Sequence, residues 1–260
     1  MSGNGPCRVE CDGAVMTITI DRPEVLNALN PEAHAALTAA FDRYAADDDL
    51  RVAILTASGE RAFCVGSDLK ARSQSNADNH PATGFGGLTR RFDLFKPVIC
   101  AVNGLAIGGG VELMIACDLV IAAEHAQFSL PEPRVGLAAL GGGGLQRLAR
   151  QLPLKQAMGL VLTGRRISAD EALRMGLINE VVPSAALISR ARALAAELQE
   201  MAPLALQASK QVMLQSLAYP DLQTAMAATY PAAERMLASE DAIEGQRAFV
   251  EKRKPVWRGR

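Results

Sequence analysis

Two glutamates stand in segments where glycine or proline shapes the backbone around them. Glu112 follows a glycine run within residues 106–113, and Glu132 lies between two prolines within residues 128–133. A third segment, residues 62–70, lies upstream and contains a glycine turn. A glycine-rich helix start can offer free backbone N–H groups to an oxyanion. Two carboxylates beside it could serve as general base and general acid, so the three segments indicate acid–base chemistry.

Each segment also has a simpler structural interpretation. The glycines at 108–110 could let a helix start pack tightly against a strand. Glu112 could stabilise the helix dipole from solvent, and Glu132 could be a solvent-facing turn residue. Apolar neighbours surround Glu112, however, and a buried carboxylate tends to have a raised pKa that suits proton transfer. The prolines hold Glu132 rigidly, so we favour catalysis for both glutamates.

The elements that must position these residues alternate between strands and helices. Short apolar or alternating runs predict strands at 16–20, 52–56, 97–102 and 119–122. Asn30 is the expected N-cap of a helix whose first residue is Pro31, and another helix should begin near Gly109. This alternation is typical of an α/β layered domain with crossover connections.

Beyond Gly144 the pattern becomes mainly helical. One extended break is expected at 178–183, and the helices are expected at 145–148, 155–162, 168–175, 187–198, 204–217 and within 221–253. We therefore predict an α/β core carrying the active site over residues 1–185 and a C-terminal helical oligomerisation region over residues 186–260. Residues 71–90 are polar and glycine-rich, and we expect them to be the most mobile segment.

Composition narrows the class of protein. The 260 residues are 49% hydrophobic and carry a net charge of −1, so no overall field attracts nucleic acid or a membrane surface. The N-terminus lacks the apolar run of a signal peptide, and five cysteines form an odd set, which favours reduced thiols in a cytoplasmic protein. Cys7 and Cys11 have no second Cys/His pair to complete a metal site, so we expect no metal.

The order and spacing of several motifs resemble the crotonase (enoyl-CoA hydratase) superfamily over nearly the whole chain. The motifs are Asp21-Arg22-Pro23 with Leu26-Asn27-Ala28-Leu29, residues 62–70, Ala101-Val102-Asn103-Gly104 with Gly108-Gly109-Gly110, Cys117-Asp118, Ala126-Gln127-Phe128, Leu162-Thr163-Gly164-Arg165, residues 169–176, Val181-Val182-Pro183, and Phe249-Val250-Glu251-Lys252-Arg253. Any one of these motifs is weak, whereas together they are specific.

The resemblance implies a fold, a substrate class and site residues. The fold would be a spiral of ββα units with a C-terminal helical trimerisation region, and the chain would form a homotrimer or a dimer of trimers. Substrates would be acyl-CoA thioesters, with no metal or redox cofactor, since coenzyme A is part of the substrate. The amides of Ser67 and Gly109 would form an oxyanion hole. Glu112 and Glu132, 20 positions apart, align with the two catalytic glutamates of the hydratases.

The resemblance also implies a set of residues that bind the substrate or its CoA part. These are Leu26, Ala28, Val65, Ser67, Asp68, Leu69, Lys70, Gly108 and Lys252. For Asp68 we favour a helix N-cap over a catalytic role. The basic tail from Lys252 to Arg260 is either a solvated terminus or a segment that approaches the CoA nucleotide, often on a neighbouring subunit; a nucleic-acid surface is a third and weaker option.

Some features fit no established role. Relatives often carry proline and glycine where Ala139 and Leu140 stand, which leaves the shape of the acyl pocket open. No Lys-Ser/Thr follows the glycines at 141–144, so a nucleotide phosphate loop is not indicated. Phe85, Phe92 and Phe95 could line the acyl pocket or the core. The histidines, His34, His80 and His125, lack mutual ligand spacing and are interpreted as surface or loop residues.

The leading hypothesis is reversible hydration of a trans-2-enoyl-CoA to a 3-hydroxyacyl-CoA. Rival reactions are dehydration of a 3-hydroxyacyl-CoA in a specialised pathway and double-bond isomerisation, which family members can manage with one carboxylate. A non-catalytic acyl-CoA- or RNA-binding module is a different class of function, and the presence of both glutamates argues against it.

Overall fold

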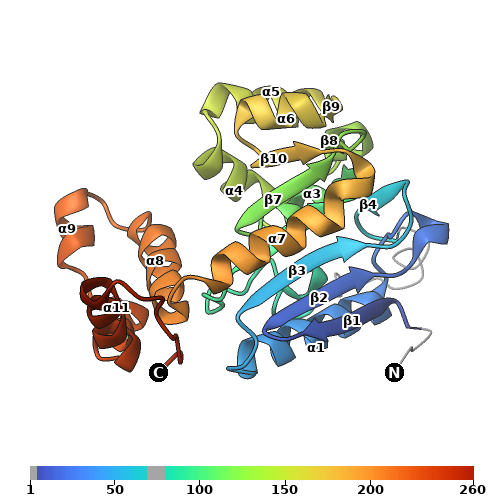
Figure 1. The fold of residues 1–260 in the computed structure, drawn as a ribbon. Helices are drawn as coiled ribbons and strands as arrows, with labels where there is room; N and C mark the ends of the chain where they lie inside the picture. The colour runs from blue at the N-terminus through green and yellow to red at the C-terminus, as the bar shows by residue number, and fades with distance from the viewer. Residues whose placement is uncertain (1–4, 69–79) are drawn as a thin grey trace.

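The computed structural model describes residues 5–68 and 80–260, and its largest element is a six-stranded sheet (Figure 1). The strand order is β1-β2-β3-β5-β7-β10. Strands β1 and β2 pair antiparallel, and the remaining neighbours are parallel. The bounds are β1 Cys7–Asp12, β2 Val15–Ile20, β3 Val52–Ala57, β5 Val98–Val102, β7 Leu119–Ala123 and β10 Glu180–Val182.

A smaller sheet has the order β4-β6-β8-β9. Its strands are β4 Ala62–Cys64, β6 Leu105–Ile107, β8 Gln127–Ser129 and β9 Ile167–Ser168. Successive strands alternate between the sheets: β3, β5 and β7 enter the larger sheet, and β4, β6 and β8 enter the smaller one. In the smaller sheet β4, β6 and β8 are mutually parallel, so their carboxyl ends meet at one edge.

Helices cover the sheets and extend beyond them. Short 3-10 turns are η1 Pro23–Val25, η2 Phe85–Gly87, η3 Glu132–Val135 and η4 Ser184–Ala186. The α-helices are α1 Pro31–Ala46, α3 Gly109–Met114, α4 Gly144–Gln151, α5 Leu154–Thr163, α6 Ala169–Met175, α7 Leu187–Gln199, α8 Pro203–Ser216, α9 Leu222–Ala227, α10 Pro231–Leu237 and α11 Glu240–Glu251. Among the described residues no helix is long and apolar enough to cross a membrane.

The central strands of the six-stranded sheet are buried on both faces, whereas the edge strand β1 is largely exposed. On one face Leu55, Cys100 and Ala122 join the main core with Phe41 of α1. On the other face a second cluster forms with α7, which crosses the sheet in Figure 1. All six residues of β3 are buried, as its continuous apolar run predicted. The predicted α/β layering is thus confirmed.

The last four helices form a helical lobe beside the sheets (Figure 1). Within this lobe, α8–α11, α8 packs against α10. Because α7 packs on the sheet, it belongs structurally with the α/β layers. The boundary between residues 185 and 186 remains a prediction, and so does the role of the lobe in trimerisation.

Local rules account for several boundaries. The Asn30 side chain accepts a hydrogen bond from the Ala33 N–H and Pro31 opens α1, so the predicted cap is confirmed. The sequence patterns did not reveal β1, β4, β6, β8 and β9, of which four have only two or three residues. Such short strands give too little periodicity to recognise.

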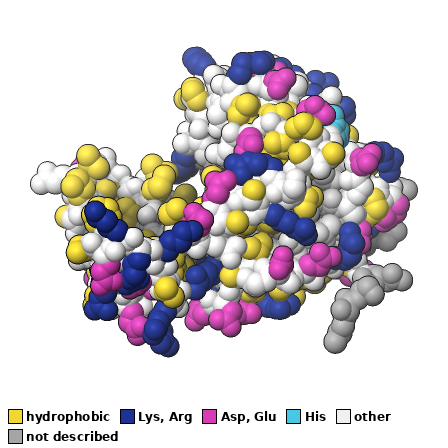
Figure 2. Space-filling view, in the orientation of Figure 1, with side chains coloured by type: hydrophobic (Ala, Val, Ile, Leu, Met, Phe, Trp, Pro, Cys, Tyr) yellow, Lys and Arg dark blue, Asp and Glu magenta, His cyan; other side chains and the backbone are white. Residues whose placement is uncertain are grey.

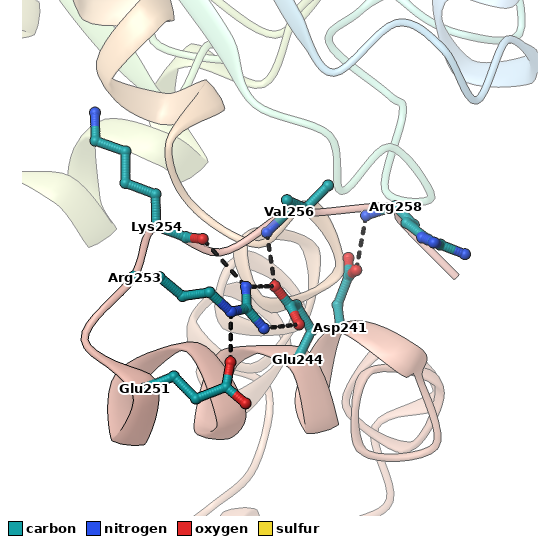
Figure 3. Close-up of polar contacts among 7 residues, drawn as sticks. All are labelled: Asp241, Glu244, Glu251, Arg253, Lys254, Val256 and Arg258. Carbon is teal, nitrogen blue, oxygen red and sulfur yellow. Dashed lines mark hydrogen bonds and ion pairs between the residues drawn. The ribbon is translucent and has the colours of Figure 1, made fainter.

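The C-terminal tail folds back on α11 through ionic and backbone contacts (Figure 3). The Arg253 guanidinium binds the carboxylates of Glu244 and Glu251. Asp241, which is buried, accepts hydrogen bonds from the N–H groups of Arg258 and Gly259 at 2.7 and 2.8 Å. These contacts replace the freely solvated terminus that was one interpretation of the sequence.

Candidate active site

The three segments of interest leave the smaller sheet at the edge where its parallel strands end. Ser67 follows β4, the glycines and Glu112 follow β6, and Glu132 follows β8. Ligands in such sheets commonly bind outside the carboxyl ends of the strands. The pairing of β4 with β6 and of β6 with β8 therefore brings together residues that are distant in the sequence.

The backbone amides of Ser67 and Gly109 lie in adjacent turns. Gly66, with φ of +91°, has its Cα so close to α3 that a Cβ there would lie 3.2 Å from the Gly109 nitrogen. Among the described residues, neither the Ser67 N–H nor the Gly109 N–H donates a hydrogen bond to a protein acceptor. Both donors are thus available to an oxygen atom from outside the chain.

Two backbone hydrogen bonds with Leu29 hold the turn that contains Ser67. The Leu29 N–H donates to the Gly66 carbonyl at 2.8 Å, and the Asp68 N–H donates to the Leu29 carbonyl at 2.9 Å. The Asp68 carboxylate also forms an ion pair with Arg22 at 3.1 Å. Leu26 and Ala28 belong to the same Leu26–Leu29 stretch, so the structure brings this predicted binding segment beside Ser67.

Glu112 lies in the first turn of α3 and only 4% of its surface is exposed. Its Oε1 accepts a hydrogen bond from the Gly144 N–H at 2.8 Å, at the first residue of α4. Negative charge is favoured there by the helix dipole. The glycines at 142 and 144 make this approach possible, because a Cβ at either position would lie within 3.0 Å of the Glu112 side chain.

Glu132 occupies a different environment in η3. Burial and, to a lesser extent, the charge of Glu112 raise the pKa of its carboxyl, while its own backbone N–H acts in the opposite sense. Its Oε2 is buried and has no hydrogen-bond partner among the described residues. Its Oε1 faces Gly108, where a Cβ would lie 2.9 Å away. The two carboxyls therefore interact, and only Glu112 receives an amide donor from another segment.

Phe85 forms the wall beside the amide of Gly109. A Cβ at Gly109 would lie 2.7 Å from Cζ of Phe85, so glycine is required for this contact. Phe85 is buried and belongs to η2, which packs against α1. Phe92 is largely exposed at 74% and does not line the same wall.

The described part of the predicted mobile segment, residues 80–90, is largely packed, and residues 71–79 lie outside the described residues.

One histidine, His34, is placed differently from the sequence-based interpretation, whereas His80 lies in a loop as expected. His34 is buried in α1 and its Nδ1 accepts a hydrogen bond from the Gly86 N–H at 3.0 Å; burial lowers its pKa to about 4. Its ring stacks edge-on with His80, with centroids 5.2 Å apart. A Cβ placed on Gly141 would lie 3.3 Å from His80 Nε2 and 3.8 Å from Glu112 Oε2, so Gly141 separates the two side chains. The surface interpretation of His34 was wrong because its helix face packs on Phe85.

The remaining predicted site residues are distributed unevenly. Val65 and Gly108 lie in the two turns that carry the amides, whereas Leu69 and Lys70 lie outside the described residues. Lys252 is exposed and ends α11 in the helical lobe, apart from the smaller sheet (Figure 1). Within this chain the structure therefore does not bring Lys252 to the carboxylates. Arg147, for which no sequence pattern indicated a role, contacts the glycine run at Gly142.

Comparison with known proteins places these observations in a family. Residues 10–260 match the family described as enoyl-CoA hydratase/isomerase. A carnitinyl-CoA dehydratase from Salmonella typhi is 45% identical over 258 residues, covering 96% of this chain and 97% of that protein. The crystal structure of enoyl-CoA hydratase from Mycobacterium tuberculosis H37Rv has a TM-score of 0.92 at 38% identity, covering 99% of this chain and 100% of that one. An enoyl-CoA hydratase structure from Bacillus anthracis has a TM-score of 0.91 at 35% identity, with coverage of 98% and 100%.

Proposed function

Because the chain belongs to the enoyl-CoA hydratase/isomerase family, we propose that it catalyses the reversible hydration of a trans-2-enoyl-CoA to a 3-hydroxyacyl-CoA. The observation that carries the proposal is the pair of carboxyls in unequal environments at the end of the smaller sheet. Glu112 accepts the Gly144 N–H, whereas burial raises the pKa of Glu132. Pairs of titratable groups whose environments differ in this way suit the roles of base and acid.

In the proposed reaction the amides of Ser67 and Gly109 bind the thioester oxygen and draw electrons from the double bond. Glu112 accepts a proton from water as the hydroxyl oxygen bonds to the β-carbon. Glu132 gives its proton to the α-carbon, and the enolate charge that develops rests on the thioester oxygen between the two donors. Return of a proton from Glu112 to Glu132 through solvent restores both carboxyls, so the sum is one water added across the double bond. Losing one such donor typically costs about 10²–10³ in rate.

We assign the adjoining residues to substrate binding. Leu26, Ala28, Val65, Asp68 and Gly108 lie in or beside the two amide turns, and Leu69 and Lys70 are assigned from the resemblance alone because they lie outside the described residues. No metal or redox cofactor is part of the proposed reaction, since the enolate charge is held by backbone donors and coenzyme A arrives with the substrate. For Lys252 to contact the CoA of this site, a neighbouring copy of the chain would have to supply it.

We also propose that the chain self-associates as a homotrimer or a dimer of trimers. Large apolar side chains on the helical lobe are exposed, among them Met226 at 78% and Phe249 at 86%. Apolar side chains also gather over this lobe in Figure 2. Burying them against another copy would remove apolar surface from water.

The second candidate is dehydration of a specialised 3-hydroxyacyl-CoA by the same groups in reverse. The observation that favours it is the 45% identity to proteins named carnitinyl-CoA dehydratase. The identity to the two enoyl-CoA hydratase structures above, and to a third from Mycobacterium marinum, is lower, at 35–39%. Isomerisation is less favoured, because one carboxylate can suffice for it and this site holds two. A non-catalytic binding module would have no use for either of them.

The direct test follows loss of the enoyl absorbance of crotonyl-CoA with wild-type protein and with the variants E112Q and E132Q. The proposal predicts that each variant loses at least about 10² in kcat, the lower range for one acid–base group. Carnitinyl-CoA assayed in the dehydration direction decides between the two candidates. Product mass and proton NMR identify isomerisation, which adds no water. Turnover in either variant at the wild-type rate would refute that residue's role.

A further inference from the structure

The guanidinium of Arg147 joins two segments that form opposite parts of the site. Its Nη1 donates to the Gly142 carbonyl at 2.7 Å, and its Nη2 donates to the Thr89 carbonyl at 2.6 Å. Gly142 lies in the glycine run beneath Glu112, and Thr89 follows η2, whose Phe85 packs against Gly109. One side chain therefore links the support of the base to the wall beside the oxyanion donor.

The glycine run has little freedom in how it meets Glu112. A Cβ at Gly142 would lie 2.6 Å from Glu112 Cβ, and one at Gly144 would lie 2.9 Å from Glu112 Cγ. The hydrogen bond from the Gly144 N–H depends on the same loop. A displacement of this loop by about 1 Å would move the base relative to the water it activates, and such misplacements can cost about 10²-fold in rate.

Among the described residues no carboxylate forms a direct ion pair with Arg147, and its hydrogen-bond partners are carbonyl oxygens. Burial lowers the pKa of Arg147, and the negative charge of Glu112 acts in the opposite sense. The two charges therefore interact across the glycine run without touching.

Few charged or titratable groups face Glu112. Glu132 lies on the η3 side, Arg147 projects from α4, and the imidazole of His80 lies across Gly141. The Cys117 thiol, beyond the end of α3, is also near Arg147. Arg147 is thus the one permanent cation among these groups.

We propose that Arg147 is a positioning residue for the reaction, holding the glycine run under Glu112 and joining it to the segment that carries Phe85. The inference rests on the proposed function, because it concerns how efficiently the base works. Arg147 does not contact the substrate in this assignment. Its loss should therefore lower kcat and leave KM near the wild-type value.

The test compares R147M, which keeps most of the side-chain length but loses the charge and both hydrogen bonds, with wild type in crotonyl-CoA hydration. The expected result is a fall in kcat of about 10²-fold with KM near the wild-type value, and partial recovery of rate on adding millimolar guanidinium. R147K keeps a cation but cannot span both carbonyls, so its kcat should also fall while its KM stays near the wild-type value.

The matched control is R150M on the same helix, since Arg150 is exposed and bonds only to the Gln146 carbonyl among the described residues. It should keep wild-type kinetics. If R147M fails to fold, judged by circular dichroism, R147K carries the test. Unchanged kcat, or a loss of rate with a raised KM and no rescue by guanidinium, would overturn the inference. Absence of hydration by wild type would instead refute the proposed function, so the two failures are distinct.

Discussion

The two glutamates show how identical side chains can be given different chemistry by what surrounds them. Glu112 is almost fully buried, yet it receives the amide of Gly144 and the field of Arg147. Glu132 is only partly buried, and its inner oxygen has no partner among the described residues. An unsatisfied buried oxygen costs stability, and proteins tolerate this cost mainly where function requires it.

The raised pKa of Glu132 has a consequence for stability. An unfolded glutamate titrates near about 4.3. Because burial raises the folded value, the folded protein binds this proton more tightly than the unfolded chain. The contribution to folding is favourable below the unfolded pKa and is lost as the pH rises through the folded pKa. At a pH above the folded pKa the ionised carboxyl therefore costs stability.

We expect E132Q to melt at a higher temperature than wild type at pH 8, with the difference shrinking as the pH falls toward 4. Each kcal/mol of relief would raise Tm by about 2–4 °C for a chain of this size. Differential scanning calorimetry across this pH range measures the effect. The control is E124Q, on an exposed residue, which should show no such trend. A Tm difference that is constant with pH would show that ionisation of Glu132 is not the cause.

At the level of elements, the site depends on close contact between α3 and the smaller sheet. Gly110 is the tightest point, because a Cβ there would overlap the carbonyl oxygen of Cys64 at the end of β4. The backbone of α3 at Gly110 cannot shift without moving Gly109, and the backbone of β4 at Cys64 cannot shift without moving Gly66. The packing interpretation of the glycine run therefore holds at Gly110, and a role of Gly109 in chemistry remains part of the proposed function.

We predict opposite outcomes for two glycine-to-alanine changes in helices. G110A should destabilise the fold by more than about 4 kcal/mol, since it forces backbone against backbone. G159A in α5 has nothing within 4 Å of its Cβ, so alanine should stabilise that helix by about 0.5–1 kcal/mol. Urea unfolding followed by circular dichroism compares them. Comparable stability of the two variants would contradict the predicted contact between Gly110 and Cys64.

At the scale of the whole molecule, the helical lobe exposes apolar side chains that a single chain leaves uncovered. Leu222, Met226, Leu237 and Phe249 are each more than 70% exposed. The C-terminal tail is held against this lobe by hydrogen bonds to Asp241 and Glu244 (Figure 3), so the lobe presents a defined surface. A surface of this kind is suited to burial against a second copy.

Light scattering should therefore give a mass of three or six times the 27.5 kDa chain. The double variant M226E/F249E should shift the mass toward that of one chain, because burying two charges costs several kcal/mol. V9E on the outer strand β1 serves as the control, since it adds a charge away from the helical lobe. A monomeric wild-type protein would refute the proposed self-association, and with it the supply of Lys252 from a neighbour.

The sequence by itself determined the elements with strong local signals and the class of chemistry. The Asn30–Pro31 cap, the apolar run of β3 and the glycine start of α3 follow from rules that act within a few residues. The order of motifs was sufficient for the family, which the matches to known proteins confirmed.

Only the tertiary structure decided which residues meet. Pairing of the three-residue strands β4, β6 and β8 places Ser67, Gly109 and Glu132 at one edge, and strands so short leave no periodic trace in the sequence. The link from Arg147 to Thr89 spans 58 positions, and the contact of His34 with His80 spans a similar length. Such contacts depend on the packing of distant segments, which local residue preferences do not encode.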